Sequence, residues 1–96
     1  MNKIAVIYNP NAGSGKIKKL LQIKERLSLN NSVTIFDTQK PGDATEIAKR
    51  ECKNFDIVVA AGGDGTINEV INGIDKDTKL GIVPLGTANI LAIEAG

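Results

Sequence analysis

The strongest constraint on the fold is a set of four short apolar runs spread along the whole chain. They cover residues 4–7, 33–36, 57–60 and 80–83. Each run is continuous rather than alternating, which is typical of strands buried on both faces of a parallel sheet. Segments with helical spacing of apolar residues separate the runs. The resulting order β-α-β-α-β-α-β predicts a single α/β layered domain with right-handed crossovers.

Three helices are expected between these strands. The first, over residues 16–29, places four apolar side chains on one face: Ile17, Leu20, Leu21 and Leu27. The second is expected to open with Asp43 as its N-cap and Glu46 three residues later. The third is expected to open at Thr66, with Glu69 three residues later. Both pairs have the spacing of a capping box, in which the acid bonds back to the N-cap N–H.

Polar or glycine-rich segments follow each of the four predicted strands. They are residues 9–16, Thr38, residues 62–66 and residues 84–89. Because the carboxyl ends of parallel strands lie at one edge of a sheet, these segments should converge where α/β sheets bind ligands. In the last of them, Thr87 either turns its hydroxyl into the site or caps the segment that follows.

The segment after the third strand has the composition of a phosphate-binding turn. Its sequence is Gly62-Gly63-Asp64-Gly65-Thr66. Glycine lets backbone N–H groups approach a ligand closely, and the N-terminus of the following helix favours an anion. A carboxylate beside phosphates is unfavourable unless it holds a cation or a hydroxyl proton, so Asp64 indicates phosphoryl transfer. The alternative role of Asp64 is to satisfy N–H groups at the helix start.

The first of these segments is close to two nucleotide-binding motifs and matches neither. The Walker motif needs glycine where Pro10 stands and Ser or Thr where Ile17 stands, and the dinucleotide fingerprint needs glycine at Lys18. These mismatches argue against a P-loop NTPase and a dinucleotide-binding domain. What remains is a loop suited to phosphate at a helix start, made of Ser14, Gly15 and Lys16. Lys16 could equally be a solvated lysine.

Absent residue types exclude several kinds of chemistry. The 96 residues include no histidine, which rules out Ser-His-Asp and Cys-His catalysis and imidazole metal sites. The formal net charge is +1, so no broad electrostatic claim about nucleic acid follows, and no nucleic-acid partner is expected. The single cysteine, Cys52, is expected to be a partly buried helix residue. The chain shows no signal peptide and no apolar run of membrane-spanning length, and its lone cysteine fits a reducing cytoplasm.

Three motifs together resemble the diacylglycerol kinase catalytic domain family, which includes bacterial lipid kinases, sphingosine kinases and ceramide kinases. They are Asn9-Pro10 with Ser14-Gly15, residues 62–70, and residues 84–89. NAD kinases and phosphofructokinases share the Gly-Gly-Asp-Gly turn, but the Asn-Pro loop and the Gly-Thr-x-Asn motif favour the lipid kinase branch. The resemblance implies a three-layer, parallel-sheet, Rossmann-like domain of the NAD kinase and diacylglycerol kinase type.

The resemblance also implies a role for each motif residue. The ATP-binding residues would be Asn9, Pro10, Ser14, Gly15, Lys16, Thr38, Gly62, Gly63, Asp64, Gly65, Thr66, Ile67, Asn68 and Thr87. Thr38 would lie near the nucleotide base, and residues 62–68 would wrap the phosphates. Asp64 is the expected catalytic residue, close to Mg²⁺ or to the reacting hydroxyl. No residue of this chain is assigned as a metal ligand.

Enzymes of this family carry a second, β-rich domain that supplies the lipid pocket, further metal ligands and the proposed general base. The resemblance thus identifies residues 1–96 as the N-terminal ATP-binding domain of a lipid kinase, with the C-terminal domain absent from this chain. Its expected partners are ATP and, through the missing domain, a membrane lipid acceptor. The expected location is cytoplasmic and peripheral to the membrane.

Further expectations concern the chain by itself. Alone, it is expected to be inactive as a lipid kinase and to be capable of self-association through the surface that docks the missing domain, including Ile90, Leu91 and Ile93. Two alternatives stay open at this point. One is a fragment of an NAD-kinase-like enzyme, and the other is a nucleotide-binding or regulatory module without catalytic activity.

Overall fold

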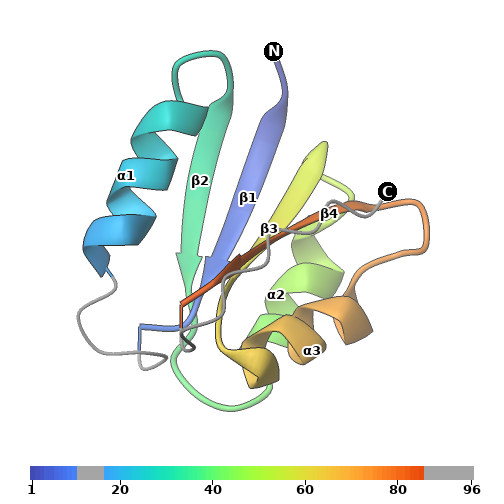
Figure 1. The fold of residues 1–96 in the computed structure, drawn as a ribbon. Coiled ribbons are helices and arrows are strands. Elements are labelled where there is room, and N and C mark those ends of the chain that lie inside the picture. The colour runs from blue at the N-terminus through green and yellow to red at the C-terminus, as the bar shows by residue number, and fades with distance from the viewer. Residues whose placement is uncertain (11–16, 86–96) are drawn as a thin grey trace.

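The chain folds around a four-stranded parallel sheet with strand order β2-β1-β3-β4 (Figure 1). We describe a computed structural model, in which residues 1–10 and 17–85 are placed. The elements are β1 (Lys3–Tyr8), α1 (Ile17–Leu27), β2 (Ser32–Asp37), α2 (Asp43–Glu51), β3 (Ile57–Gly62), α3 (Asp64–Gly73) and β4 (Lys79–Pro84). This order and the parallel pairing of every neighbouring strand confirm the predicted α/β class.

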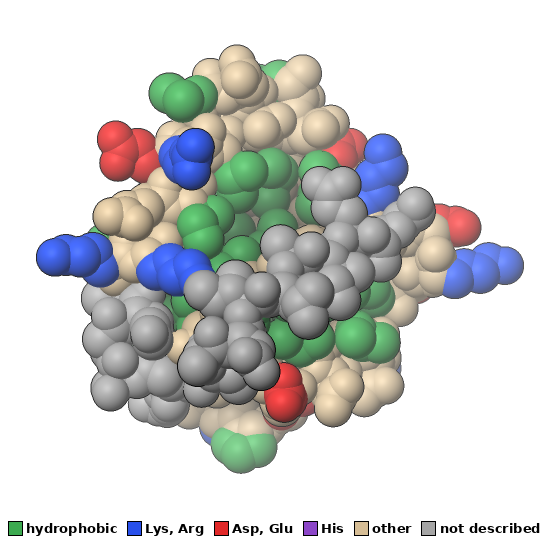
Figure 2. Space-filling model, in the orientation of Figure 1, with side chains coloured by type: hydrophobic (Ala, Val, Ile, Leu, Met, Phe, Trp, Pro, Cys, Tyr) green, Lys and Arg blue, Asp and Glu red, His purple; other side chains and the backbone are tan. Residues whose placement is uncertain are grey.

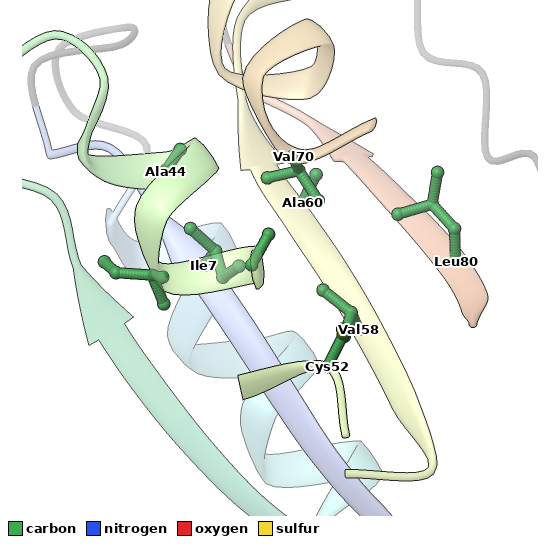
Figure 3. Packing of buried hydrophobic residues seen from close by; sticks show 9 residues of the cluster. Ile7, Ala44, Cys52, Val58, Ala60, Val70 and Leu80 are labelled. Carbon is green, nitrogen blue, oxygen red and sulfur yellow. The ribbon is translucent and has the colours of Figure 1, made fainter. Parts of the chain in front are cut away.

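Helices cover both faces of the sheet, which explains why the strand sequences are continuously apolar. Side chains of α2 and α3 pack on one face, in the cluster seen in Figure 3: Ile7, Ala44, Ile47, Ala48, Cys52, Val58, Ala60, Val70 and Leu80. Cys52, predicted to be a partly buried helix residue, is the C-cap just after α2 and is buried in this cluster. Leu20 of α1 packs on the other face in a second cluster with Ile4, Val6, Tyr8, Val59, Ala61 and Leu85. The three layers predicted from the resemblance are thus confirmed.

Helix α1 differs from its predicted form. It ends at Leu27, and Leu29 beyond it is 78% exposed. Leu20 is buried and Leu27 is half-buried, but Leu21 is 52% exposed, so its placement on the buried face was wrong. Successive residues of a helix point about 100° apart, so a neighbour of Leu20 turns away from the sheet.

Figure 2 shows hydrophobic side chains gathered over the middle of the sheet on the viewed face.

The predicted capping box at the start of α2 is wrong. Gly42 is the N-cap, with a left-handed backbone at φ 92°, and makes no side-chain cap. Asp43 is already inside the helix, and its carboxylate accepts the backbone N–H groups of Gln39 and Lys40 at 2.7 and 3.1 Å. The glycine adopts a conformation that L-residues avoid, so the chain enters the helix one residue earlier than predicted. Glu46 is exposed.

The predicted capping box at the start of α3 is wrong as well. The helix begins at Asp64, with Gly63 as its N-cap and no side-chain cap. Thr66 therefore lies within the first turn, where it is buried. Glu69 turns away from its own helix start and accepts the N–H of Gly42 at 3.1 Å. The acid thus joins two helices instead of capping one.

Gly73 is where α2 and α3 approach most closely. A Cβ there would meet the backbone oxygen of Thr45, and it would lie 2.8 Å from the Cβ of Ala48. We expect Gly73→Ala to lower the free energy of unfolding by at least about 2 kcal/mol, because the two helices must separate. Urea denaturation measures the loss. Gly65→Ala is the matched control, since a Cβ at Gly65 meets nothing within 4 Å; equal stability of the two variants would contradict this account.

Candidate functional site

A cavity of about 260 Å³ lies at the carboxyl edge of the sheet. Its walls come from the ends of β1 and β2, the loop after β2, and the first turns of α2 and α3. The lining residues are Asn9, Thr38, Gln39, Lys40, Pro41, Ala44, Gly65, Thr66 and Glu69. Segments that follow three different strands therefore meet at one place, as the sequence predicts for the carboxyl ends of parallel strands.

The parallel hydrogen-bond ladder continues past the strand ends and holds two of the predicted site residues. The N–H of Asn9 donates to the carbonyl oxygen of Ala61 at 3.1 Å, and the N–H of Thr38 donates to that of Tyr8 at 2.9 Å. Thr38 is 6% exposed although it is polar. The backbone of both residues is thus fixed by the sheet, which makes this part of the cavity wall rigid.

A side-chain hydrogen bond connects the end of β1 to α3. The Nδ2 of Asn9 donates to the Oγ1 of Thr66 at 3.2 Å. A Cβ on Gly62 would lie 2.8 Å from both the Cβ and the Oγ1 of Thr66. Glycine is therefore required at position 62 by the packing of Thr66. This requirement is independent of any ligand.

The N-terminus of α3 is open in the way that an anion site needs. The first intrahelical bond runs from the N–H of Ile67 to the carbonyl of Gly63 at 3.1 Å. The N–H groups of residues 64–66 precede it and have no acceptor within the helix. A Cβ placed on Gly63 or on Gly65 meets nothing within 4 Å. Backbone donors with free space in front of them fit a phosphate group.

The other described residues predicted for the site are placed differently. Asp64 is the first residue of α3 and is exposed, beside Gly65 of the cavity wall. Ile67 is half-buried and packs against the core on the α2 and α3 side of the sheet, so only its backbone can face a ligand. Asn68 and Pro10 are exposed. Among the described residues, none of these four side chains lines the cavity.

Sequence reasoning missed one whole wall of the cavity. Gln39, Lys40 and Pro41 follow Thr38, and Glu69 faces them from α3. The Pro-Gly pair at 41–42 signals a turn before a helix, but no motif marks Gln39 or Lys40. Their place depends on how α2 packs against α3, which is a tertiary contact.

Four predicted site residues lie outside the described residues: Ser14, Gly15, Lys16 and Thr87. Just after β4, the N–H of Leu85 donates to the carbonyl of Gly62 at 2.9 Å. The segment after β4 therefore starts beside the glycine turn. Within residues 1–10 and 17–85, no three acidic or cysteine side chains gather where they could hold a metal ion. No helix in this part of the chain is long and apolar enough to cross a membrane.

Comparison with known proteins identifies the family. Residues 3–96 match the family described as Diacylglycerol kinase catalytic domain. A diacylglycerol kinase of Staphylococcus haemolyticus is 47% identical over 98 residues, which cover 93% of this chain and 29% of that protein. For a diacylglycerol kinase of Bacillus subtilis the identity is 40% over 102 residues, covering 100% of this chain and 34% of that protein.

Solved structures agree with the sequence comparison. A crystal structure of a diacylglycerol kinase from Bacillus anthracis str. Sterne has a TM-score of 0.79 and 34% sequence identity to this chain. The match covers 91% of this chain and 34% of that one. The chain thus spans about a third of the length of the relatives it matches. With the family pattern matched over residues 3–96, this chain belongs to the diacylglycerol kinase catalytic domain family.

Proposed function

We propose that residues 1–96 form the N-terminal, ATP-binding domain of an ATP-dependent lipid kinase that phosphorylates the hydroxyl of a diacylglycerol-type lipid. The observation that carries the proposal is the uncapped N-terminus of α3 beside a cavity formed at the carboxyl ends of the strands. Membership of the diacylglycerol kinase catalytic domain family supports the reaction class. Relatives named diacylglycerol kinase support the class of acceptor.

The residues present fit a nucleotide. The open space in front of Gly63 and Gly65 admits a phosphate, which the N–H groups of the first turn of α3 can bind. In this proposal the other side of the cavity, lined by Thr38 and the two residues after it, receives the rest of the nucleotide. The side chain of Asn9 bonds Thr66 of α3, and the N–H of Thr38 donates to the carbonyl of Tyr8, so both sides of the site are attached to the end of β1 before a ligand enters.

Asp64 is the proposed catalytic residue. It stands at the start of α3, next to the N–H groups that are proposed to hold phosphate. When bound, Mg²⁺-ATP supplies the phosphoryl group and part of the charge compensation that phosphoryl transfer needs. In this proposal the Asp64 carboxylate holds either the proton of the reacting hydroxyl or the cation at that place.

The lipid pocket, the further metal ligands and the general base are proposed to lie outside these residues. The chain covers 29% and 34% of two of the relatives it matches, so most of their length has no counterpart here. In the same proposal the intact protein acts in the cytoplasm at the membrane surface, where the lipid acceptor is. Self-association through the surface that docks the second domain remains part of this proposal.

The test is transfer of radiolabelled phosphate from ATP by the intact protein. We expect diacylglycerol in mixed micelles to be phosphorylated, and NAD offered at the same concentration to give no product. The 96-residue chain alone should transfer none. Phosphorylation of NAD would favour the NAD-kinase alternative, because the two families share the glycine turn. ATP binding by the intact protein without transfer to either acceptor would indicate a regulatory module.

A further inference from the structure

We propose that Glu69 is a positioning residue, which holds the loop after β2 against α3 and so sets the width of the cavity. The proposal rests on the proposed function, because that cavity is where the nucleotide is expected to bind. Glu69 was expected to cap its own helix, and the structure gives its carboxylate a different partner. It acts through the backbone of another element.

Glu69 makes two hydrogen bonds to the start of α2. Its Oε1 accepts the backbone N–H of Gly42 at 3.1 Å, and its carbonyl oxygen accepts the Oγ1 hydroxyl of Thr45 at 2.8 Å. The residue is half-buried and lines the cavity. Glu69 of α3 is therefore hydrogen-bonded to both the N-cap and the first turn of α2.

The loop between β2 and α2 depends on attachments at its ends. At its beginning, the N–H of Thr38 extends the sheet ladder. Within it, the Asp43 carboxylate accepts two N–H groups, which make the loop a compact unit. At its end, Gly42 has a left-handed backbone, and the bond to Glu69 connects it to α3. Loss of that bond would leave the loop compact and joined to β2 and α2, but without the side-chain bond that holds Gly42 against α3.

This bond joins the loop side of the cavity to its α3 side, because Gly42 directly follows the lining residue Pro41 and Glu69 is itself a lining residue. Gln39, Lys40 and Pro41 belong to one wall, while Gly65, Thr66 and Glu69 belong to the opposite wall. The helices also meet at Gly73, so they would stay packed together if the bond were lost. The expected consequence is a wider and more variable cavity in a protein that remains folded. A ligand must then order the loop, which weakens its binding.

The test compares Glu69→Ala with Glu69→Gln in the intact protein. An amide oxygen can accept the same N–H, so Gln should restore what Ala removes. For Glu69→Ala we expect amide exchange at Gly42 to accelerate about tenfold and the Kd for ATP to rise about tenfold, the scale of one hydrogen bond. Glu69→Gln should stay within about threefold of wild type in both. Glu46→Ala removes a nearby exposed carboxylate and should change neither.

Each contrary result has a distinct meaning. Unchanged Gly42 exchange in Glu69→Ala overturns the positioning role whatever happens to ATP. Equal loss of ATP affinity in the Ala and Gln variants, with Gly42 exchange normal in Gln, also overturns it, because the negative charge itself would then be what the ligand needs. If the wild-type protein binds no ATP, the proposed function fails, while the exchange measurement alone still decides whether Glu69 holds the loop.

Discussion

Replacing Asp64 by asparagine in the intact protein should lower the turnover of phosphoryl transfer at least about a hundredfold, the scale of one acid–base or electrostatic contribution. Asn has almost the same shape and keeps an acceptor oxygen at the first residue of α3, but it cannot take a proton or balance a cation. Asp64 is exposed, so its replacement leaves no buried group without a partner. The fold should therefore be unchanged. Steady-state kinetics with saturating ATP and lipid measure the effect.

Asp75→Asn is the matched control for this variant. Asp75 is also exposed and lies just after α3, at the end of the helix that is distant from the glycine turn. Its substitution removes the same charge and should leave turnover within about twofold of wild type, as is usual for a surface change away from special features. Near-normal turnover of Asp64→Asn would assign Asp64 to the helix terminus alone, where a carboxylate complements the helix dipole.

Gly65→Asp should abolish measurable nucleotide binding while the protein stays folded. A Cβ at this position meets nothing within 4 Å, so the side chain has room. A carboxylate in the first turn of a helix is even favourable for the helix. The same charge stands where a phosphate is proposed to bind, beside the cavity that Gly65 lines. The variant thus measures the effect of the charge on nucleotide binding separately from its effect on folding stability.

Calorimetric titration measures the affinity for ATP, and circular dichroism measures whether the protein is folded and how stable it is. We expect no detectable heat of binding with Gly65→Asp, a native-like spectrum, and an unfolding midpoint close to that of wild type. Gly65→Ala tests the added Cβ without the charge and should weaken ATP binding far less than Gly65→Asp does, because a Cβ occupies only part of the open space and brings no negative charge. Unchanged ATP affinity in the Asp variant would show that phosphate does not bind at this turn.

The strands could be predicted from sequence because each apolar run is continuous, although only the inner strands β1 and β3 are buried on both sheet faces and the outer strands β2 and β4 are partly buried. Each observed strand contains its predicted core and extends it by two residues, as β3 does at Ala61 and Gly62. Helix starts were predicted less well. Capping patterns describe a helix in isolation, whereas Asp43 bonds its own loop and Glu69 bonds the next helix. Rules that consider only neighbouring residues in the sequence do not predict such partners.

The same distinction holds for the site. Asn9, Thr38 and Thr66 could be predicted to meet because they stand at or near the ends of parallel strands, and the sheet brings such ends together. The part contributed by Gln39, Lys40 and Glu69 could not. It exists because α2 lies close enough to α3 for Glu69 to reach Gly42, and that distance depends on the absence of a side chain at Gly73.

The three glycines of the turn would not be equally free to change during evolution. A lineage that no longer needed a ligand here would still be held to glycine at position 62, because any side chain there would collide with Thr66. Gly63 and Gly65 would face no such restriction, since side chains at both have space. Acidic substitutions at 63 and 65 beside a retained Gly62 would therefore mark a descendant that has kept the fold and lost nucleotide binding.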